Sequence, residues 1–412
     1  MFTNTKDMKM FDNEILNEIF EYQKELFYSY KNISYKRYFY NQIFNTNSKL
    51  VGIIGARGVG KTTALIQYLN EYPASVSEKL YISADFIKID SLFEIIREFV
   101  KEGGKVVVID EIHKYPNFEI ELKKIYDILN VKVFFSGSSA LQLDNAKADL
   151  SRRAVIYEVK GLSFREFLEI DLNIKLPVFS LEEILSNHID ISFELLEKFL
   201  LKPKFREYIK NGFYPFYFDD KDNYLKKLNE VVNTSIEVDI PSVFPIEYET
   251  VNKLKKIVRL ICETYPFTLN VQEFLTKMQM NKNDYKRLYR YFYFLQKAKI
   301  LRLLWSEYRG DNILTKPEKI YLNNTNLHYA YCAKREIGTV REVFFASMLE
   351  DYRLQTAKKV DFVVNEKYTF EIGGKNKTKS QIKDVKNSFI IKDDIEIGIK
   401  NIIPLWLFGF LY

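Results

Sequence analysis

The run GARGVGKT at residues 55–62 constrains the fold of this chain more than any other feature. It follows the apolar residues 50–54 and precedes a helix-like segment, which is the strand, loop and helix setting of a phosphate-binding P-loop. Glycines let such a loop turn tightly, so that backbone N–H groups and the positive end of the following helix converge on phosphate. The sequence therefore predicts a nucleoside triphosphate site.

The loop residues have distinct expected tasks. Lys61 would reach the β- and γ-phosphates, and the hydroxyl of Thr62 would ligate magnesium. We expect ATP and Mg²⁺ as cofactors. The predicted nucleotide contacts are Gly55, Arg57, Gly58, Val59, Gly60, Lys61, Thr62, Thr63 and Asp110.

Length and composition allow several well-packed domains. With 412 residues the chain exceeds the usual size of one core, so two to four domains are expected. Apolar residues make up 47% of it, with 33 Phe and 29 Tyr, which is ample for packed cores. The net charge of +6 is modest and indicates only a mild preference for anionic partners.

Cysteine usage and hydropathy favour a reducing cytoplasm and no membrane partner. Cys262 and Cys332 are too few for a disulfide framework, and their surroundings are typical of small buried apolar positions. No run of about eighteen apolar residues occurs, and the start of the chain lacks the hydrophobic core of a signal peptide. The apolar residues 402–412 are too few to span a bilayer, and we expect them to form a buried terminal strand.

Apolar, β-branched runs separated by helix-length segments predict an α/β core. Such runs, buried on both faces, are typical of a parallel sheet covered by helices. The expected strands are 51–54, 80–82, 106–109, 131–135 and 155–159. The fold class is therefore a parallel-sheet P-loop domain over residues 48–171.

Two acids close the third run, VVVIDE. Asp110 would hold the magnesium, and Glu111 would orient and polarise the attacking water, as P-loop ATPases that hydrolyse require. The letters DEIH also resemble a helicase box, but no second series of apolar strands with a glycine turn follows residue 171. We therefore expect His113 to pack or hydrogen-bond rather than to catalyse.

The next segments supply further candidate catalytic groups. Ser136 ends the fourth run and is the candidate sensor of the γ-phosphate, although a Ser/Gly cluster is also an ordinary turn. Arg152 and Arg153 precede the fifth run, where a guanidinium could stabilise the transition state in a neighbouring subunit. The alternative for these arginines is a surface pair balanced by nearby acids.

Taken together, five motifs resemble a prokaryotic family of AAA+ type ATPases. They are GARGVGKTT, VVVIDEIHKYPNFEIELKKIYD, FFSGSS, DLSRRA and GLSFREFL. Members of that family carry a winged-helix segment and a C-terminal domain of unknown function that resembles PD-(D/E)XK nucleases. The chain departs from the family at Ala56, where proline is usual, and at Phe213, where glycine is usual. The resemblance implies an N-terminal helical segment at 1–47, the ATPase core at 48–171, a lid or linker at 172–248, the winged helix at 249–330 and the nuclease-like domain at 331–412.

Residues 250–324 have the pattern of three helices followed by two strands. On the third helix, a/d spacing predicts buried Tyr285, Leu288, Phe292 and Leu295, and exposed Lys286, Arg287, Arg290 and Tyr293. Basic residues on such a helix can meet DNA phosphates, so Lys286, Arg287 and Arg290 are candidate DNA contacts. Docking of a protein partner fits the pattern equally well.

The last eighty residues carry three acids in the arrangement expected of the nuclease-like fold. Glu342 lies on a helix-like stretch, Asp361 opens a strand and Glu371 ends the next, a set that could ligate magnesium. The usual lysine two positions after the second acid is replaced by Gly373, and the nearest lysine in the sequence is Lys375. We therefore expect a degenerate fold used for binding, with a cationic lip at Lys375, Lys377, Lys379 and Lys383.

The sequence thus predicts a Mg²⁺-dependent ATPase that forms homo-oligomers and couples ATP to DNA or to a protein partner. Two alternatives stay open, an ATP-gated nuclease and a signalling scaffold that hydrolyses ATP slowly.

Overall fold

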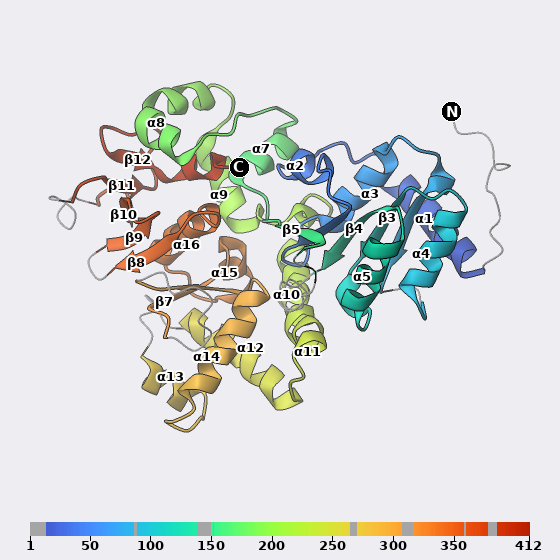
Figure 1. Ribbon diagram of the computed structural model, residues 1–412. Coiled ribbons are helices and arrows are strands. Elements are labelled where there is room, and N and C mark those ends of the chain that lie inside the picture. The colour runs from blue at the N-terminus through green and yellow to red at the C-terminus, as the bar shows by residue number, and fades with distance from the viewer. Residues whose placement is uncertain are drawn as a thin grey trace. The chain divides into compact units, whose positions relative to one another are not determined.

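The computed structural model describes residues 14–85, 89–137, 150, 152–263, 270–306, 316–357, 360–377 and 385–412. The chain forms two compact units, one of Met1–Lys160 with Ser242–Phe244 and one of Gly161–Pro241 with Pro245–Tyr412 (Figure 1). Lys379 and Lys383 of the expected cationic lip lie outside the described residues. Among the described residues, no helix is long and apolar enough to cross a membrane.

The first unit is built on a parallel five-stranded sheet with the order β2-β3-β4-β1-β5. Its strands match the five predicted runs closely: β1 Leu50–Ile54, β2 Lys79–Ser83, β3 Val106–Asp110, β4 Lys132–Gly137 and β5 Ala154–Glu158. Every residue of β1, β2 and β3 is buried, because helices cover both faces of the sheet (Figure 1). Strand β5 differs, since it lies at the edge and leaves Val155 40% exposed.

Helices around this sheet bury apolar faces against it. They are α1 Glu14–Ser29, α2 Tyr40–Phe44, α3 Lys61–Glu71, α4 Leu92–Lys101 and α5 Phe118–Ile128. Gln23 of α1 is fully buried and joins the edge of β2, donating to the Lys79 carbonyl at 3.1 Å and accepting from the Tyr81 N–H at 2.6 Å. The paired amide satisfies strand groups that would otherwise be buried without partners.

The second unit begins with helices and ends with a mixed sheet. Its helices are α7 Phe164–Leu172, α8 Leu181–Leu196, α9 Leu201–Asn211, α10 Tyr224–Thr234, α12 Tyr248–Glu263, α13 Val271–Lys277, α14 Tyr285–Lys297, α15 Thr325–Tyr331 and α16 Ile337–Met348. The short helix α11 Ile240–Val243 begins in this unit and ends in the segment assigned to the first. The antiparallel pair β6 Leu301–Leu304 and β7 Lys319–Leu322 follows α14, as the sequence predicts. The mixed sheet has the order β12-β11-β10-β9-β8.

Helix α16 and the C-terminal residues pack against that mixed sheet. Its strands are β8 Leu354–Ala357, β9 Val360–Val364, β10 Tyr368–Gly373, β11 Ser388–Lys392 and β12 Ile402–Pro404. Phe345 of α16 packs on the sheet, with its ring centroid 5.1 Å from that of Phe370 and 4.7 Å from that of Phe408. The expected terminal strand is only partly correct, because residues 405–410 form the buried 3₁₀ helix η5 Leu405–Phe410.

The buried face of α14 is broader than predicted. Leu288, Phe292 and Leu295 are buried as expected, but Tyr285 is 42% exposed, so that prediction is wrong. Tyr285 is the first residue of the helix, where the chain has not yet entered the packed interface. Tyr289, Tyr291 and Phe294 are buried instead.

The two cysteines form a disulfide, which corrects their interpretation as unpaired buried residues. Cys262 on α12 and Cys332 after α15 have Cα atoms 5.0 Å apart, within the usual range for a disulfide. The spacing of 70 residues hides this proximity in the sequence. Both side chains are buried, as expected.

We predict that the Cys262→Ser/Cys332→Ser variant is less stable than the wild type by about 2–4 kcal/mol, because the cross-link restricts the unfolded chain. Thermal unfolding of both proteins in non-reducing buffer measures the difference. Prior denaturation with dithiothreitol should bring the wild type to the variant's value and leave the variant unchanged. Equal stability before reduction would contradict a disulfide.

Candidate functional site

The P-loop is bent by glycines between β1 and α3. A Cβ on Gly55 would lie 2.4 Å from the Val159 carbonyl oxygen, so only glycine lets the two backbones approach this closely. Gly58 and Gly60 have φ values of 83° and 94°, a region that side chains disfavour. Helix α3 then begins at Lys61, with its N-terminus at the loop, where free N–H groups can bind an anion.

Two cations hold the loop. The Lys61 ammonium lies 3.0 Å from the carbonyl oxygens of both Gly55 and Ala56, and the side chain is only 4% exposed. Arg37 donates to the Val59 carbonyl and, at 2.9 Å, to the Lys160 carbonyl, and so ties the loop to the segment after β5. Arg37 precedes α2 and belongs to no motif, so no sequence pattern indicated it.

Asp110 collects three hydroxyl donors at the carboxyl end of β3. Thr62 Oγ1 donates to its Oδ2 at 2.6 Å, and the Tyr81 hydroxyl donates to the same oxygen at 2.8 Å. Ser136 Oγ donates to Oδ1. The carboxylate and the P-loop hydroxyl therefore share one place, and both are oxygen ligands of the kind that Mg²⁺ takes.

Tyr81 is a site residue that the sequence analysis missed. It lies on β2, is 2% exposed, and its pKa is raised by burial and by the Asp110 charge. A tyrosine inside an apolar strand resembles a core residue, so the pattern alone cannot reveal it. Only the pairing of β2 with β3 brings it to Asp110.

Sheet order places Ser136 between the loop and the acids, because β4 lies between β1 and β3. Ser136 Oγ accepts a hydrogen bond from the Glu111 N–H at 3.1 Å, in addition to its bond to Asp110. The side chain is fully buried. Ser136 is therefore in contact with both predicted acids.

Glu111 has an unusual backbone conformation with φ 53° and ψ 40°. This left-handed conformation costs a residue other than glycine about 1–2 kcal/mol. Such strain occurs most often at functional sites. Glu111 Oε2 lies 3.3 Å from His113 Nδ1 without a hydrogen bond between these two atoms, and His113 is 4% exposed, which agrees with the expected packing role of that histidine.

Burial raises the pKa of the Glu111 carboxyl, whereas the nearby Lys61 charge acts in the opposite direction. A carboxylate with a raised pKa is a stronger base than an exposed one. The environment of Glu111 therefore suits a proton acceptor.

The two candidate arginines differ. Arg153 forms a bidentate pair with Asp127, with Nε–Oδ1 and Nη2–Oδ2 distances of 2.9 and 2.8 Å. Arg152 is exposed and forms no hydrogen bond or ion pair within the part of the chain that the structure describes. The alternative of a pair balanced by acids thus applies to Arg153, with Asp127 as its partner.

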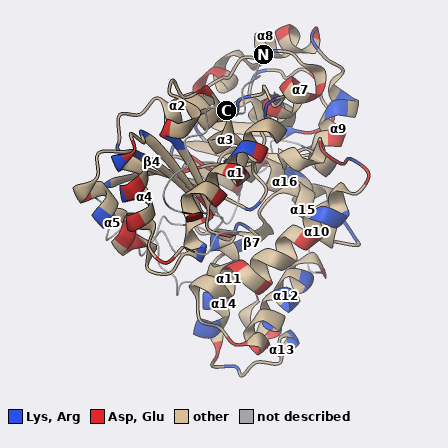
Figure 2. Ribbon diagram, turned by 90° about the vertical axis from the view of Figure 1, so that its right-hand side faces the viewer, with Lys and Arg blue, Asp and Glu red and all other residues tan. Residues whose placement is uncertain are grey.

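Basic residues are also concentrated on α12 and α14 of the second unit (Figure 2). Lys286, Arg287 and Arg290 are all exposed on α14, as predicted, and Tyr293 is partly exposed. The Arg290 guanidinium lies 5.4 Å from the centroid of the Phe294 ring. The three candidate DNA contacts therefore share one accessible helix.

In the C-terminal part, the three predicted acids lie among lysines. Lys319 Nζ lies 3.1 Å from Glu342 Oε2 and 3.5 Å from Asp361 Oδ1, and the Tyr321 hydroxyl donates to Glu342. Glu371 Oε2 accepts from the Asp361 N–H at 3.2 Å. In the described parts of the chain, no group of three or more acids, histidines or cysteines is arranged to hold a metal ion. Lys319 takes the position between two of the expected ligands.

Lys377, rather than Lys375, is the lysine of this acid cluster. Its Nζ lies 2.8 Å from Glu371 Oε1. A Cβ on Gly373 would lie 2.6 Å from Lys377 Cβ and 2.7 Å from its Cγ, so the Lys377 stem fills the space that a side chain at position 373 would take. The prediction for Lys375 rested on distance along the sequence, and the turn after β10 reverses that order.

Lys319 and Lys377 partly compensate for the burial of the Glu342 and Glu371 carboxyl groups. Burial raises the pKa values of Glu342 and Glu371, whereas Lys319 acts to lower that of Glu342 and Lys377 that of Glu371. Each of the three acids in the cluster therefore lies against a lysine, which partly balances the buried negative charge.

We predict that Lys319→Met lowers the free energy of unfolding by about 1–3 kcal/mol at pH 7.5, because Glu342 loses a charged partner. The folded-state pKa of Glu342 already exceeds 4.5 and would rise further in the variant. Burying the ionised Glu342 carboxylate then costs more free energy than in the wild type. The loss of unfolding free energy in Lys319→Met should therefore grow as the pH rises above about 4.5 and shrink below it. Thermal unfolding at pH 5 and 7.5 measures this, with exposed Lys316→Met as the matched control. A deficit that is the same at both pH values would contradict the pairing.

Two family models match parts of this chain, and one of the matched ranges includes the P-loop. Residues 47–168 match the model described as an AAA domain, and residues 202–336 match a domain of unknown function, DUF8612. An uncharacterized protein of Methanocaldococcus jannaschii, MJ1637, is 25% identical over 411 residues, which cover 90% of this chain and 86% of that protein.

Three solved structures resemble parts of the chain. C. elegans PCH-2 is 20% identical, with a TM-score of 0.25 over 42% of this chain and 51% of that one, so the match spans about half of PCH-2. Katanin is 13% identical, with a TM-score of 0.29 over 42% and 69%. AMPPCP-bound DnaA from Aquifex aeolicus is 15% identical, with a TM-score of 0.26 over 70% and 95%. At such TM-scores these structures add nothing to the assignment.

The AAA domain match and the parallel sheet agree on the same part of the chain. Together they support an AAA domain with a P-loop at residues 47–168, and with it ATP binding and hydrolysis in general.

Proposed function

We propose that this protein binds Mg²⁺–ATP at residues 55–63 and hydrolyses it with Asp110 and Glu111. The observation that carries the proposal is the 2.6 Å hydrogen bond from Thr62 Oγ1 to Asp110 Oδ2, which joins the P-loop to the carboxylate strand. We propose that Arg57, Val59 and Thr63 also contact the nucleotide, because they lie in the loop and in the first turn of α3.

Each residue has a separate task in this proposal. The N–H groups of the loop and Lys61 bind the phosphates, while Thr62 and Asp110 hold Mg²⁺, which neutralises the charge that develops on the phosphate oxygens. Glu111 accepts a proton from the attacking water. Ser136, in contact with both acids, links the γ-phosphate to the position of Glu111.

We further propose that the protein acts as a homo-oligomer in which Arg152 reaches the ATP of a neighbouring subunit. Arg152 has no hydrogen-bond or ion-pair partner among the described residues, whereas Arg153 is paired with Asp127, and this difference supports the choice of Arg152. A guanidinium supplied in this way is worth about 10³–10⁵ in rate.

We predict that Arg152→Ala lowers the rate of phosphate release at least about 100-fold, whereas Arg153→Ala mainly loses the stability of the Asp127 pair. Wild-type activity per subunit should rise with protein concentration. Activity that is independent of concentration and unchanged in Arg152→Ala would contradict the subunit-shared site.

The second unit would couple the ATP state to DNA or to a protein partner. The exposed side chains of Lys286, Arg287 and Arg290 support a winged helix that binds DNA. We also propose the division of the chain into the five domains expected from the sequence. ATPase assays with and without double-stranded DNA distinguish the two partners, with Lys286→Ala/Arg287→Ala/Arg290→Ala as the variant. A cytoplasmic location is proposed from the sequence alone, since the Cys262–Cys332 disulfide removes the argument from cysteine usage.

For the C-terminal acid cluster we propose binding rather than cleavage, since its carboxylates are paired with lysines. Incubation with plasmid and Mg²⁺, with and without ATP, is expected to leave the plasmid intact. Cleavage that Asp361→Ala abolishes would favour the alternative of an ATP-gated nuclease.

A further inference from the structure

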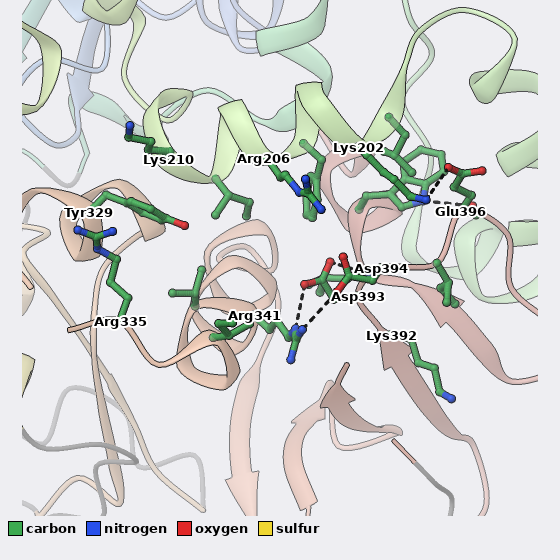
Figure 3. Close-up of a pocket in the computed structure, with 18 residues that line it drawn as sticks. Lys202, Arg206, Lys210, Tyr329, Arg335, Arg341, Lys392, Asp393, Asp394 and Glu396 are labelled. Carbon is green, nitrogen blue, oxygen red and sulfur yellow. Dashed lines mark hydrogen bonds and ion pairs between the residues drawn. The ribbon is translucent and has the colours of Figure 1, made fainter. Parts of the chain in front are cut away.

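A cavity of about 470 Å³ lies within the second unit, apart from the acid cluster and from α14. Its walls are α9, the segment from α15 into α16, residues 392–396 and η5 (Figure 3). A volume of this size accommodates several side chains of a ligand.

The floor of the cavity is apolar. Leu201, Phe205 and Ile209 line it from successive turns of α9, and Val340, Leu405 and Trp406 complete it. Ile337 is 64% exposed beside them, an unusual exposure for a large aliphatic side chain. The cavity therefore offers apolar surface that a ligand could bury.

Three of its six cations already have partners. Arg341 lies 2.9 Å from Asp393 and 3.6 Å from Asp394, and Lys202 lies 3.5 Å from Glu396. Lys392 donates to the Lys375 carbonyl at 2.8 Å. These contacts account for all three acids that line the cavity.

The other cations, Arg206, Lys210 and Arg335, form no ion pair with another described residue. Arg206 and Lys210 lie one turn apart on α9, and Arg335 rests 4.8 Å from the centroid of the Tyr329 ring. Lys210, Tyr329 and Arg335 lie at one end of the cavity and Glu396 lies at the other, with Arg206 between (Figure 3). Positive charge without an ion-pair partner in the described part of the chain thus lies at one end and in the middle of the cavity, and the acids, which are already paired, lie in the middle and at the other end (Figure 3).

We propose that this cavity docks an acidic, amphipathic peptide segment of a partner protein. Its carboxylates pair with Arg206, Lys210 and Arg335, and its apolar side chains cover the floor. Charge complementarity and the apolar floor together select this occupant. A nucleic-acid strand carries a charge at every nucleotide and would bring phosphates against Asp393, Asp394 and Glu396.

The inference rests on the proposed function only in giving the second unit a protein partner, and binding is measured without nucleotide. Failure of this test therefore leaves the ATPase untouched, and failure of the ATPase leaves this test valid.

A phage-displayed library of random twelve-residue peptides, selected on the full-length chain, tests the proposal. The selected sequences should be enriched in Asp and Glu together with Leu, Ile, Phe or Trp. The dominant one, synthesised with a fluorescent label, should bind Arg206→Glu/Lys210→Glu at least tenfold more weakly than the wild type by anisotropy. The control Lys175→Glu/Lys226→Glu carries the same charge change on exposed lysines outside the cavity and should bind as the wild type does.

Three results would overturn the proposal. Equal weakening in both double variants would show a general charge effect, and unchanged binding in Arg206→Glu/Lys210→Glu would place the peptide elsewhere. Enrichment of peptides without Asp or Glu would show that the cavity cations do not contribute to peptide binding. Thermal unfolding of the variants verifies that each is folded, as expected for substitutions of exposed side chains.

Discussion

Replacing Glu111 by glutamine is expected to slow ATP hydrolysis about 10²- to 10⁴-fold while Mg²⁺–ATP still binds. Glutamine keeps the size of the side chain but cannot accept the proton of the attacking water. The P-loop, Lys61 and Asp110 are unchanged in this variant, so the affinity for nucleotide should stay within about a factor of a few. Single-turnover phosphate release and binding of a fluorescent ATP analogue measure the two quantities separately.

The pKa of Glu111 adds a second signature. Because burial raises it above 4.5, wild-type hydrolysis should lose activity on acidification at a higher pH than an ordinary glutamate would dictate. The native state holds the proton more tightly than the unfolded state, so stability falls as the pH rises from about 4.5 through the folded-state pKa. Glu111→Gln removes this loss and should be no less stable than the wild type at pH 7.5.

Glu119→Gln on α5 is the matched control, since it changes the same side chain near the same strand without a predicted catalytic task. A Glu111→Gln variant that hydrolyses ATP at the wild-type rate would show that another group activates the water. A variant that fails to bind nucleotide would show that Glu111 serves the binding site.

Replacing Lys61 by alanine is expected to weaken ATP binding by about 10- to 100-fold and to abolish turnover. The ammonium would lose charge-assisted hydrogen bonds to phosphate, each worth about 1.5–3 kcal/mol, where about 1.4 kcal/mol is tenfold in affinity. In the structure, Lys61 is held over the loop by the Gly55 and Ala56 carbonyls, so the group is already positioned at the bend.

The measurement is isothermal titration of Mg²⁺–ATP into each protein. Lys101→Ala, which removes an exposed lysine of α4, serves as the control and should bind as the wild type does. Normal binding and turnover by Lys61→Ala would remove the basis for the nucleotide site.

Much of the first unit could be predicted from the sequence because its signals are local. Buried strands such as 106–110 are continuous apolar runs, and the P-loop glycines stand next to the lysine that they serve. The contact of Asp110 with Thr62 follows from strand order, which the P-loop class fixes.

Contacts between distant segments could not be predicted in this way. Tyr81 resembles a core residue until β2 pairs with β3, and Lys319 comes from the β6–β7 pair rather than from the helix and strands that carry the acids. Lys377 replaces Lys375 because a turn folds it back over Gly373. In each case the deciding quantity is a distance in space that no spacing in the sequence encodes.

A crystal structure of Glu111→Gln with Mg²⁺–ATP tests the central claim most directly. We predict phosphates within hydrogen-bond distance of the N–H groups of residues 58–62 and of Lys61 Nζ. The metal should lie about 2.1 Å from Thr62 Oγ1 and contact Asp110 directly or through one water. A nucleotide bound elsewhere, or a metal that neither Thr62 nor Asp110 approaches, would contradict the account.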